Sequence, residues 1–135
     1  MFHESIIARS YKYRYNPIMK TLPITQVIPE VKEKLQNHNR LVLQAPPGAG
    51  KTTALPLALL DEPWLQGKKI LMLEPRRLAV RSSAARMAEL LDEKVGERIG
   101  YQVKMDSVQS KDTQILIVTE GYSRVNSKMT HLWRM

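Results

Sequence analysis

Residues 41–53 constrain this chain more than any other stretch. The apolar run Leu41-Val42-Leu43 predicts a short buried strand, and the prolines and glycines that follow it predict a turn. Residues 51–60 are apolar on most sides, which predicts a helix packed on a sheet. A strand, a Gly-rich loop that ends in Gly-Lys-Thr, and a helix together indicate a phosphate-binding loop in an α/β domain.

The residue types of this loop suit the chemistry of phosphate. Gly48 and Gly50 can adopt backbone angles that are closed to other residues, so a phosphate can come close to the main chain. The N–H groups near Ala49 and the start of the next helix favour an anion. Lys51 supplies a cation for the β- and γ-phosphates, and Thr52 supplies a hydroxyl for Mg²⁺. The pattern therefore indicates a nucleoside triphosphate site.

Two points limit this interpretation. Ala45 stands where the usual pattern begins with Gly, although the part that faces phosphate, from Gly48 onward, is intact. The alternative is a Gly/Pro turn with no binding role, before a helix that happens to begin with Lys-Thr. Only the agreement of the motif with its strand–loop–helix context argues against this alternative. The motif alone does not separate a helicase from a kinase or a transporter.

The rest of the chain alternates between strand and helix patterns. Apolar runs predict strands at residues 69–74 and 114–118 and a short strand at 99–103. Helical spacing predicts a helix that begins near Thr25 and stops at residues 37–39, and a long helix at 76–91. This alternation favours a sheet of parallel strands with helices on its faces.

Composition excludes several classes of protein. The chain has 135 residues, 43% of them hydrophobic, and no cysteine, so disulfides and Cys-ligated metal sites are absent. Its apolar runs are too short to span a bilayer, and we expect no membrane association and a cytoplasmic location. The net charge of +8 favours an anionic partner, but much of the excess lies near the two ends.

Three stretches resemble the DEAH-type ATP-dependent RNA helicases. Residues 45–53 resemble motif I, the Walker A loop, while Glu74-Pro75-Arg76-Arg77-Leu78-Ala79 resembles motif Ia and Thr119-Glu120-Gly121 resembles the start of motif Ib. The similarity covers about residues 20–121. It is closest to the bacterial HrpB type, and implies an incomplete RecA-like P-loop domain, the amino-terminal part of the first such domain, with parallel strands flanked by helices.

The resemblance also implies ligands and site residues. ATP and Mg²⁺ are the expected cofactors, Thr52 is the expected Mg²⁺ ligand, and RNA is the expected partner. Arg at the start of a helix opposes the helix dipole, so a bound phosphate would relieve it. The expected nucleotide-binding residues are Gly48, Ala49, Gly50, Lys51, Thr52 and Thr53, and the expected nucleic-acid residues are Arg76, Arg77, Thr119 and Glu120.

The chain departs from this family in ways that bear on catalysis. No DEAH-like acidic box follows residues 114–118, and the Ser-Ala-Thr motif, the second RecA-like domain and its arginine finger are missing. We therefore expect no complete catalytic set and no competence for hydrolysis by this chain alone. A non-catalytic nucleotide- or RNA-binding fragment is the alternative, and a small P-loop kinase is a third class that the residues at 74–79 and 119–121 disfavour.

The two ends differ from the body. Residues 1–18 show no clean periodicity, which predicts an unstructured leader. A partial helicase domain is expected at 19–121, and Met19 is a candidate for the true start. Residues 122–135 contain three basic residues and no acidic one, and they do not resemble the family. Codons compatible with them restore a helical, family-like string when read in another frame, which favours a frameshifted tail; a natural short tail is the alternative. The DNA sequence beyond codon 121 decides this.

Overall fold

The computed structural model describes residues 21–38, 40–119 and 131–134, which fall into two compact units divided between Gln66 and Gly67. Each unit is described by itself below. The expected leader at 1–18 and residues 122–130 of the expected tail lie outside the described residues.

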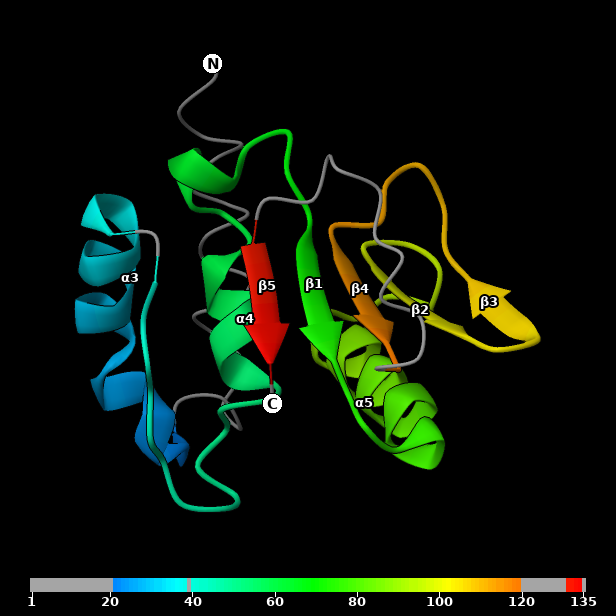
Figure 1. The fold of residues 1–135 in the computed structure, drawn as a ribbon, viewed down its shortest axis with the longest axis horizontal. Helices are drawn as coiled ribbons and strands as arrows, with labels where there is room; N and C mark the ends of the chain where they lie inside the picture. Colours follow the sequence, from blue (N-terminus) through cyan, green and yellow to red (C-terminus); the bar gives the residue numbers. More distant parts are fainter. Residues whose placement is uncertain (1–20, 39, 120–130, 135) are drawn as a thin grey trace. The chain divides into compact units, whose positions relative to one another are not determined.

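The first unit is helical. A 3₁₀ turn, η1 (Pro23–Gln26), leads into α3 (Ile28–Asn37), and α4 (Ala54–Leu59) and the 3₁₀ turn η2 (Pro63–Leu65) follow (Figure 1). The predicted helix is therefore confirmed in α3, with Pro29 in its first turn, where a missing N–H costs little. Thr25 does not cap it: its hydroxyl donates to the Leu22 carbonyl at 2.7 Å, within η1.

Around the loop, the strand predicted at 41–43 is wrong, and the helix predicted at 51–60 is present in α4 with a later start. Residues 41–43 form no strand, and the side chain of Val42 is 95% exposed. The reason is that a strand needs a backbone partner, and no described strand pairs with this run. The helix predicted at 51–60 begins only at Ala54, because residues 51–53 form turns. The apolar character that suggested it is real, since Leu55 and Leu57 are buried almost completely.

The second unit is a sheet with a long helix. The elements are β1 (Ile70–Leu73), α5 (Arg77–Leu90), β2 (Ile99–Val103), β3 (Asp106–Val108), β4 (Ile115–Val118) and β5 (His131–Arg134). The strand order is β3-β2-β4-β1-β5, with β2, β4, β1 and β5 parallel and β3 antiparallel to β2 (Figure 1). The strands predicted at 69–74, 99–103 and 114–118 and the helix predicted at 76–91 are confirmed.

The core of this unit forms around β1 and β4, which are buried at every residue. Alternate residues of the two strands, Leu71 with Leu73 and Leu116 with Val118, form one apolar cluster. Helix α5 packs against β2 and β4 and buries a stripe at helical spacing. That stripe contains Val80, Ala84, Met87, Ala88 and Leu91.

Parallel pairing brings the carboxyl ends of three strands to one edge of the sheet. Val118, the last residue of β4, lies beside Leu73 of β1 and Gln102 of β2. The residues that follow these strands therefore begin at the same edge, which is where open α/β sheets bind their ligands.

Strand β5 is a finding that the sequence did not indicate. It pairs with β1 along the whole of that strand, from Ile70 beside His131 to Leu73 beside Arg134. Sequence reasoning assigned no element here because the segment has no clear period, and strand formation depends more on available partners than on intrinsic preference. Through this pairing β1 becomes an interior strand of the sheet.

A proline in β5 tests the role of this pairing. We expect Leu132→Pro to weaken the pairing of β5 with β1, because proline has no N–H to donate and a fixed φ. Strand β1 would then be an apolar edge strand that pairs with other chains. The molar mass from light scattering should rise to that of dimers or larger species. Leu132→Ala keeps the N–H and is the control; equal masses for both variants at all concentrations would contradict the expectation.

Candidate nucleotide and nucleic-acid sites

The loop before α4 has the backbone that its glycines predict. Gly48 has a φ of +80° and Gly50 a φ of +92°, in the region that strains a residue with a side chain. Ala45 is not among the described residues of positive φ, so the departure from Gly at this position needs no unusual backbone. The loop is thus compatible with a phosphate-binding conformation despite Ala45.

The loop is held against the segment that begins η1. The Ile24 N–H donates to the Ala49 carbonyl at 2.9 Å, and Ala49 is 3% exposed. A Cβ placed on Gly50 would lie 2.8 Å from Leu22 Cδ1 and 2.9 Å from Ile24 Cγ2. Leu22 and Ile24 therefore act as packing residues, and their packing partner is the loop itself.

Four successive backbone donors of the loop are unengaged. The N–H groups of Ala54 and Leu55 both donate to the Gly50 carbonyl, at 2.9 and 3.2 Å. Within the described part of the chain, the N–H groups of residues 50–53 donate no hydrogen bond. Because unpaired donors favour an anion, these groups can serve a phosphate. The six-residue helix α4 starts after them, so the site depends on the loop more than on a helix dipole.

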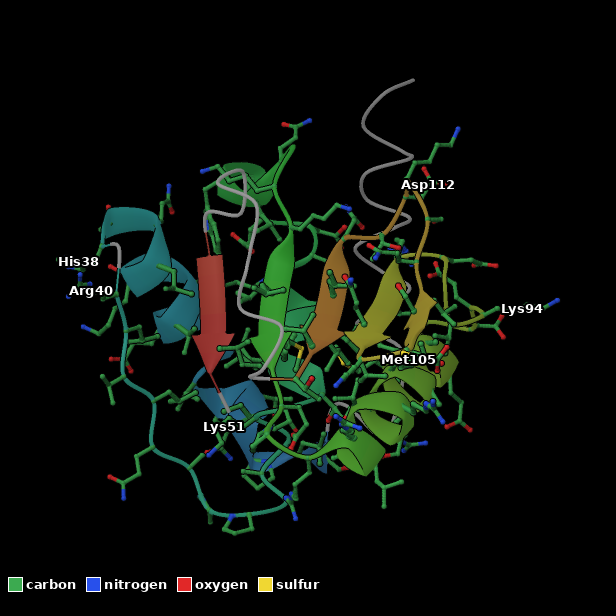
Figure 2. The ribbon with its side chains drawn as sticks, turned by 45° about the vertical axis from the view of Figure 1, so that its right-hand side comes forward. His38, Arg40, Lys51, Lys94, Met105 and Asp112 are labelled. Atoms are coloured by element: carbon green, nitrogen blue, oxygen red, sulfur yellow. The ribbon has the colours of Figure 1, made fainter. Side chains whose placement is uncertain are left out.

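Lys51 is held only loosely. Its side chain, labelled in Figure 2, is half-buried. Its Nζ donates to the Ala45 carbonyl at 3.4 Å, at the long end of hydrogen bonding. Thr52 and Thr53 are also half-buried and lie in the same turn. An ammonium group with one weak partner can move to a phosphate at little cost.

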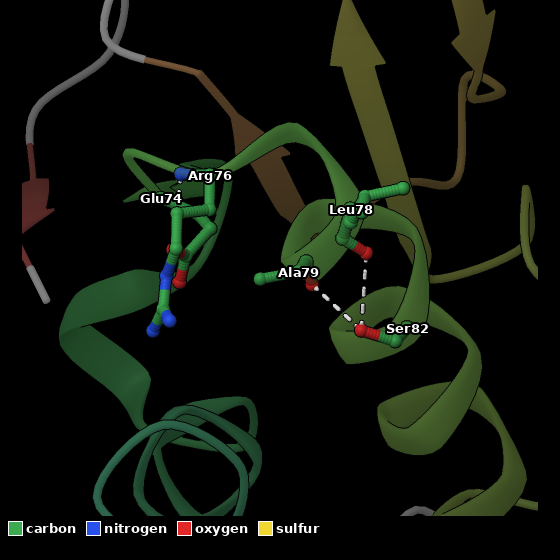
Figure 3. Close-up of polar contacts among 5 residues, drawn as sticks. All are labelled: Glu74, Arg76, Leu78, Ala79 and Ser82. Carbon is green, nitrogen blue, oxygen red and sulfur yellow. Dashed lines mark hydrogen bonds and ion pairs between the residues drawn. The ribbon is translucent and has the colours of Figure 1, made fainter.

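The second predicted site lies at the carboxyl edge of the sheet. Glu74 follows β1 directly and is 7% exposed, and its N–H donates to the Val118 carbonyl at 2.8 Å. Its Oε1 accepts a hydrogen bond from the Arg76 N–H at 3.2 Å and lies 3.7 Å from Arg76 Nε (Figure 3). The Arg76 side chain is 84% exposed, so this contact leaves the guanidinium accessible to solvent.

The structure brings three of the four predicted nucleic-acid residues to this edge. Arg77 begins α5 and is exposed, and the described residues provide no ion pair for its side chain. Thr119 follows β4 and is 9% exposed. The β1–β4 register places Thr119 beside the residues that follow Leu73. Glu120 lies outside the described residues.

Sequence reasoning missed a polar cluster next to this edge. Asp106 Oδ2 forms an ion pair with Arg81 Nη2 at 2.7 Å and accepts a hydrogen bond from the Tyr101 hydroxyl at 2.8 Å. The hydrogen bond to Asp106, followed by burial, raises the pKa of Tyr101 above its usual value. No rule of sequence spacing links Tyr101 or Asp106 to Arg81.

Comparison with known proteins identifies the class. Residues 24–131 match the family model of the DEAD/DEAH box helicases, and the chain belongs to this family. It is similar to the ATP-dependent RNA helicase HrpB of Escherichia coli, with 47% identity over 103 residues, and to HrpA of Borreliella burgdorferi, with 36% identity over 100 residues. These alignments cover 76% and 74% of this chain, but only 13% and 12% of those proteins.

Solved structures support the same fold. The crystal structure of the Escherichia coli DEAH/RHA helicase HrpB matches with a TM-score of 0.71 and 46% identity, over 75% of this chain and 13% of that one. The expected architecture, a partial RecA-like domain of mostly parallel strands flanked by helices, is confirmed. None of the helices described here is both long and apolar enough to cross a membrane.

The two loop glycines allow a test of the packing against η1. Gly50→Ala should destabilise the chain by about 2–4 kcal/mol, since it combines the cost of a left-handed residue with overpacking against Leu22 and Ile24. Gly48→Ala meets nothing within 4 Å and should cost only about 1–2 kcal/mol. Urea unfolding measures both, and equal losses would show that the Leu22 and Ile24 contact has no energetic weight.

Proposed function

We propose that this chain binds a nucleoside triphosphate, ATP by the resemblance, through residues 48–53. The observation that carries the proposal is the run of unengaged N–H groups at 50–53, next to a weakly held Lys51 and two glycines of positive φ. An anion supplies the acceptor that these donors lack, and a cation beside it offsets the phosphate charge. The family name and the names of the relatives are consistent with ATP.

Magnesium would accompany the nucleotide rather than bind the free chain. The Thr52 hydroxyl is a hard oxygen ligand in the right turn, and Mg²⁺ keeps several waters and phosphate oxygens when it binds at such sites. Among the described residues there is no cluster of three or more acidic, His or Cys side chains that could hold a metal. We therefore assign Thr52 as one ligand of a nucleotide-bound ion.

We propose further that the carboxyl edge of the sheet binds an RNA backbone, with Arg76, Arg77, Thr119 and Glu120 as the contact residues. Two exposed guanidinium groups at the start of α5 supply positive charge and donors that suit phosphate. Thr119 supplies a hydroxyl from the neighbouring strand. Contacts of this kind position a nucleic acid without reading its sequence.

Removing the Lys51 ammonium tests the nucleotide site. Lys51→Ala should raise the Kd for Mg-ATP by roughly 100-fold, because it removes a charged contact worth about 3 kcal/mol. Isothermal titration measures the affinity, and Lys68→Ala, at an exposed lysine, is the control for lost charge. Equal affinities of Lys51→Ala and the parent would refute the assignment.

Binding should not lead to turnover. Hydrolysis requires that metal, attacking water and transition-state charge be managed together, and residues 1–135 contain no DEAH-like acidic box. We expect phosphate release at the background rate, with and without RNA. Robust turnover that Lys51→Ala removes would overturn this, and phosphate transfer to a nucleoside would favour a kinase.

Salt dependence tests the RNA site. Each of Arg76→Gln and Arg77→Gln should weaken the binding of single-stranded RNA and reduce the slope of log K against log salt by about 0.7, since one phosphate contact is lost. Fluorescence anisotropy from low to moderate salt measures the slope. Arg86→Gln, on the same helix and paired with Glu89, is the control; equal effects of all three changes would indicate only diffuse attraction.

A further inference from the structure

The cluster of Arg81, Tyr101 and Asp106 connects three elements of the second unit through one carboxylate oxygen. Asp106 is the first residue of β3, Tyr101 lies in β2 and Arg81 lies in the second turn of α5. Asp106 Oδ2 is ion-paired with Arg81 Nη2 at 2.7 Å and accepts a hydrogen bond from the Tyr101 hydroxyl at 2.8 Å. We call these three residues the clasp.

The clasp is close to the proposed RNA-binding arginines in the fold. Arg81 is four residues after Arg77, so the two side chains share one face of α5. Asp106 follows the turn after β2, and β2 ends at the same edge of the sheet as β4. The turn contains Met105, which has a φ of +74° and is 94% exposed. The clasp therefore ties the first turns of α5 to the β2–β3 hairpin.

Burial and charge argue that this contact positions α5 more than it stabilises the fold. The side chain of Arg81 is 59% exposed and that of Asp106 is 35% exposed, so solvent screens their attraction. The hydrogen bond from the Tyr101 hydroxyl is directional, so it restricts the position of Asp106 Oδ2. Contacts that contribute little energy can still determine where a helix begins relative to its sheet, and small displacements matter at a binding site.

We propose that the clasp sets the position of the amino-terminal turns of α5, and so holds Arg76 and Arg77 where they meet an RNA backbone. Arg81, Tyr101 and Asp106 are then positioning residues. This inference rests on the proposed RNA site. It also assigns Arg81 a role different from that of Arg77, since the charge of Arg81 is already matched by Asp106.

The sign of one substitution separates this role from simple electrostatics. If Asp106 merely lowered the positive charge near RNA, Asp106→Asn would strengthen RNA binding. If the clasp positions α5, the same change weakens binding although it removes a negative charge. Tyr101→Phe changes no charge at all, so any loss of affinity that it causes is positional.

The experiment uses the full chain and two readouts. Anisotropy with a single-stranded RNA gives the Kd, and amide hydrogen exchange of a peptide covering residues 76–90 reports the order of α5. The variants are Tyr101→Phe, Asp106→Asn, Arg81→Asp, Asp106→Arg and the double exchange Arg81→Asp with Asp106→Arg. Glu89→Gln breaks the exposed Arg86–Glu89 pair, 2.7 Å long, and is the control for loss of one acid from α5.

We expect Tyr101→Phe and Asp106→Asn to raise the Kd by about 2- to 5-fold and to speed exchange in the first turns of α5. The two single charge reversals should be worse, and the double exchange should recover to within about twofold of the parent. Glu89→Gln should bind as tightly as the parent or slightly more tightly.

Tighter binding by Asp106→Asn, unchanged exchange in Tyr101→Phe and Asp106→Asn, or no recovery in the double exchange would each overturn the clasp. The proposed RNA site fails differently. If the parent shows no RNA binding that depends on Arg76 and Arg77, that site is refuted and the role of the clasp in RNA binding falls with it. Hydrogen exchange then still decides whether the clasp orders α5.

Discussion

The parallel pairing of β1 with β4 is the constraint on which the second unit depends. It buries both strands along their whole length and aligns Leu73 with Val118. A shift of one residue would separate Glu74 from the Val118 carbonyl that its N–H now reaches. The placement of Arg76, Arg77 and Thr119 at one edge is therefore a consequence of this register.

What could be predicted from the sequence was local and strongly patterned. The apolar runs at 69–74 and 114–118 predict buried strands, and β1 and β4 are buried at every residue. The apolar residues of α5 recur at helical spacing, which predicts a helix. The positive φ values of Gly48 and Gly50 are ones that glycine adopts at no steric cost, so the residue types indicated where such a backbone could occur. Both candidate sites were located in the same way, since short motifs carry their chemistry with them.

What could not be predicted depends on partners far away in the chain. Leu41-Val42-Leu43 has the composition of a strand, but none of the described strands pairs with it, whereas His131–Arg134 has no clear pattern and pairs with β1. The clasp unites residues 81, 101 and 106 only after the sheet and α5 have packed. Sequence spacing does not encode such contacts, because strand order and helix placement decide them.

The close contact between Gly50 and the residues that begin η1 has a thermodynamic consequence. Leu22 and Ile24 lie against the loop, so its shape and their packing form one cooperative element of the first unit. By linkage, any ligand that prefers this loop conformation also stabilises the packed form of η1. Above the Kd, the stabilising free energy increases with the logarithm of the ligand concentration. The Ile24 N–H donates to the Ala49 carbonyl, so its hydrogen exchange reports whether a ligand occupies the loop, although Ile24 itself need not contact the ligand.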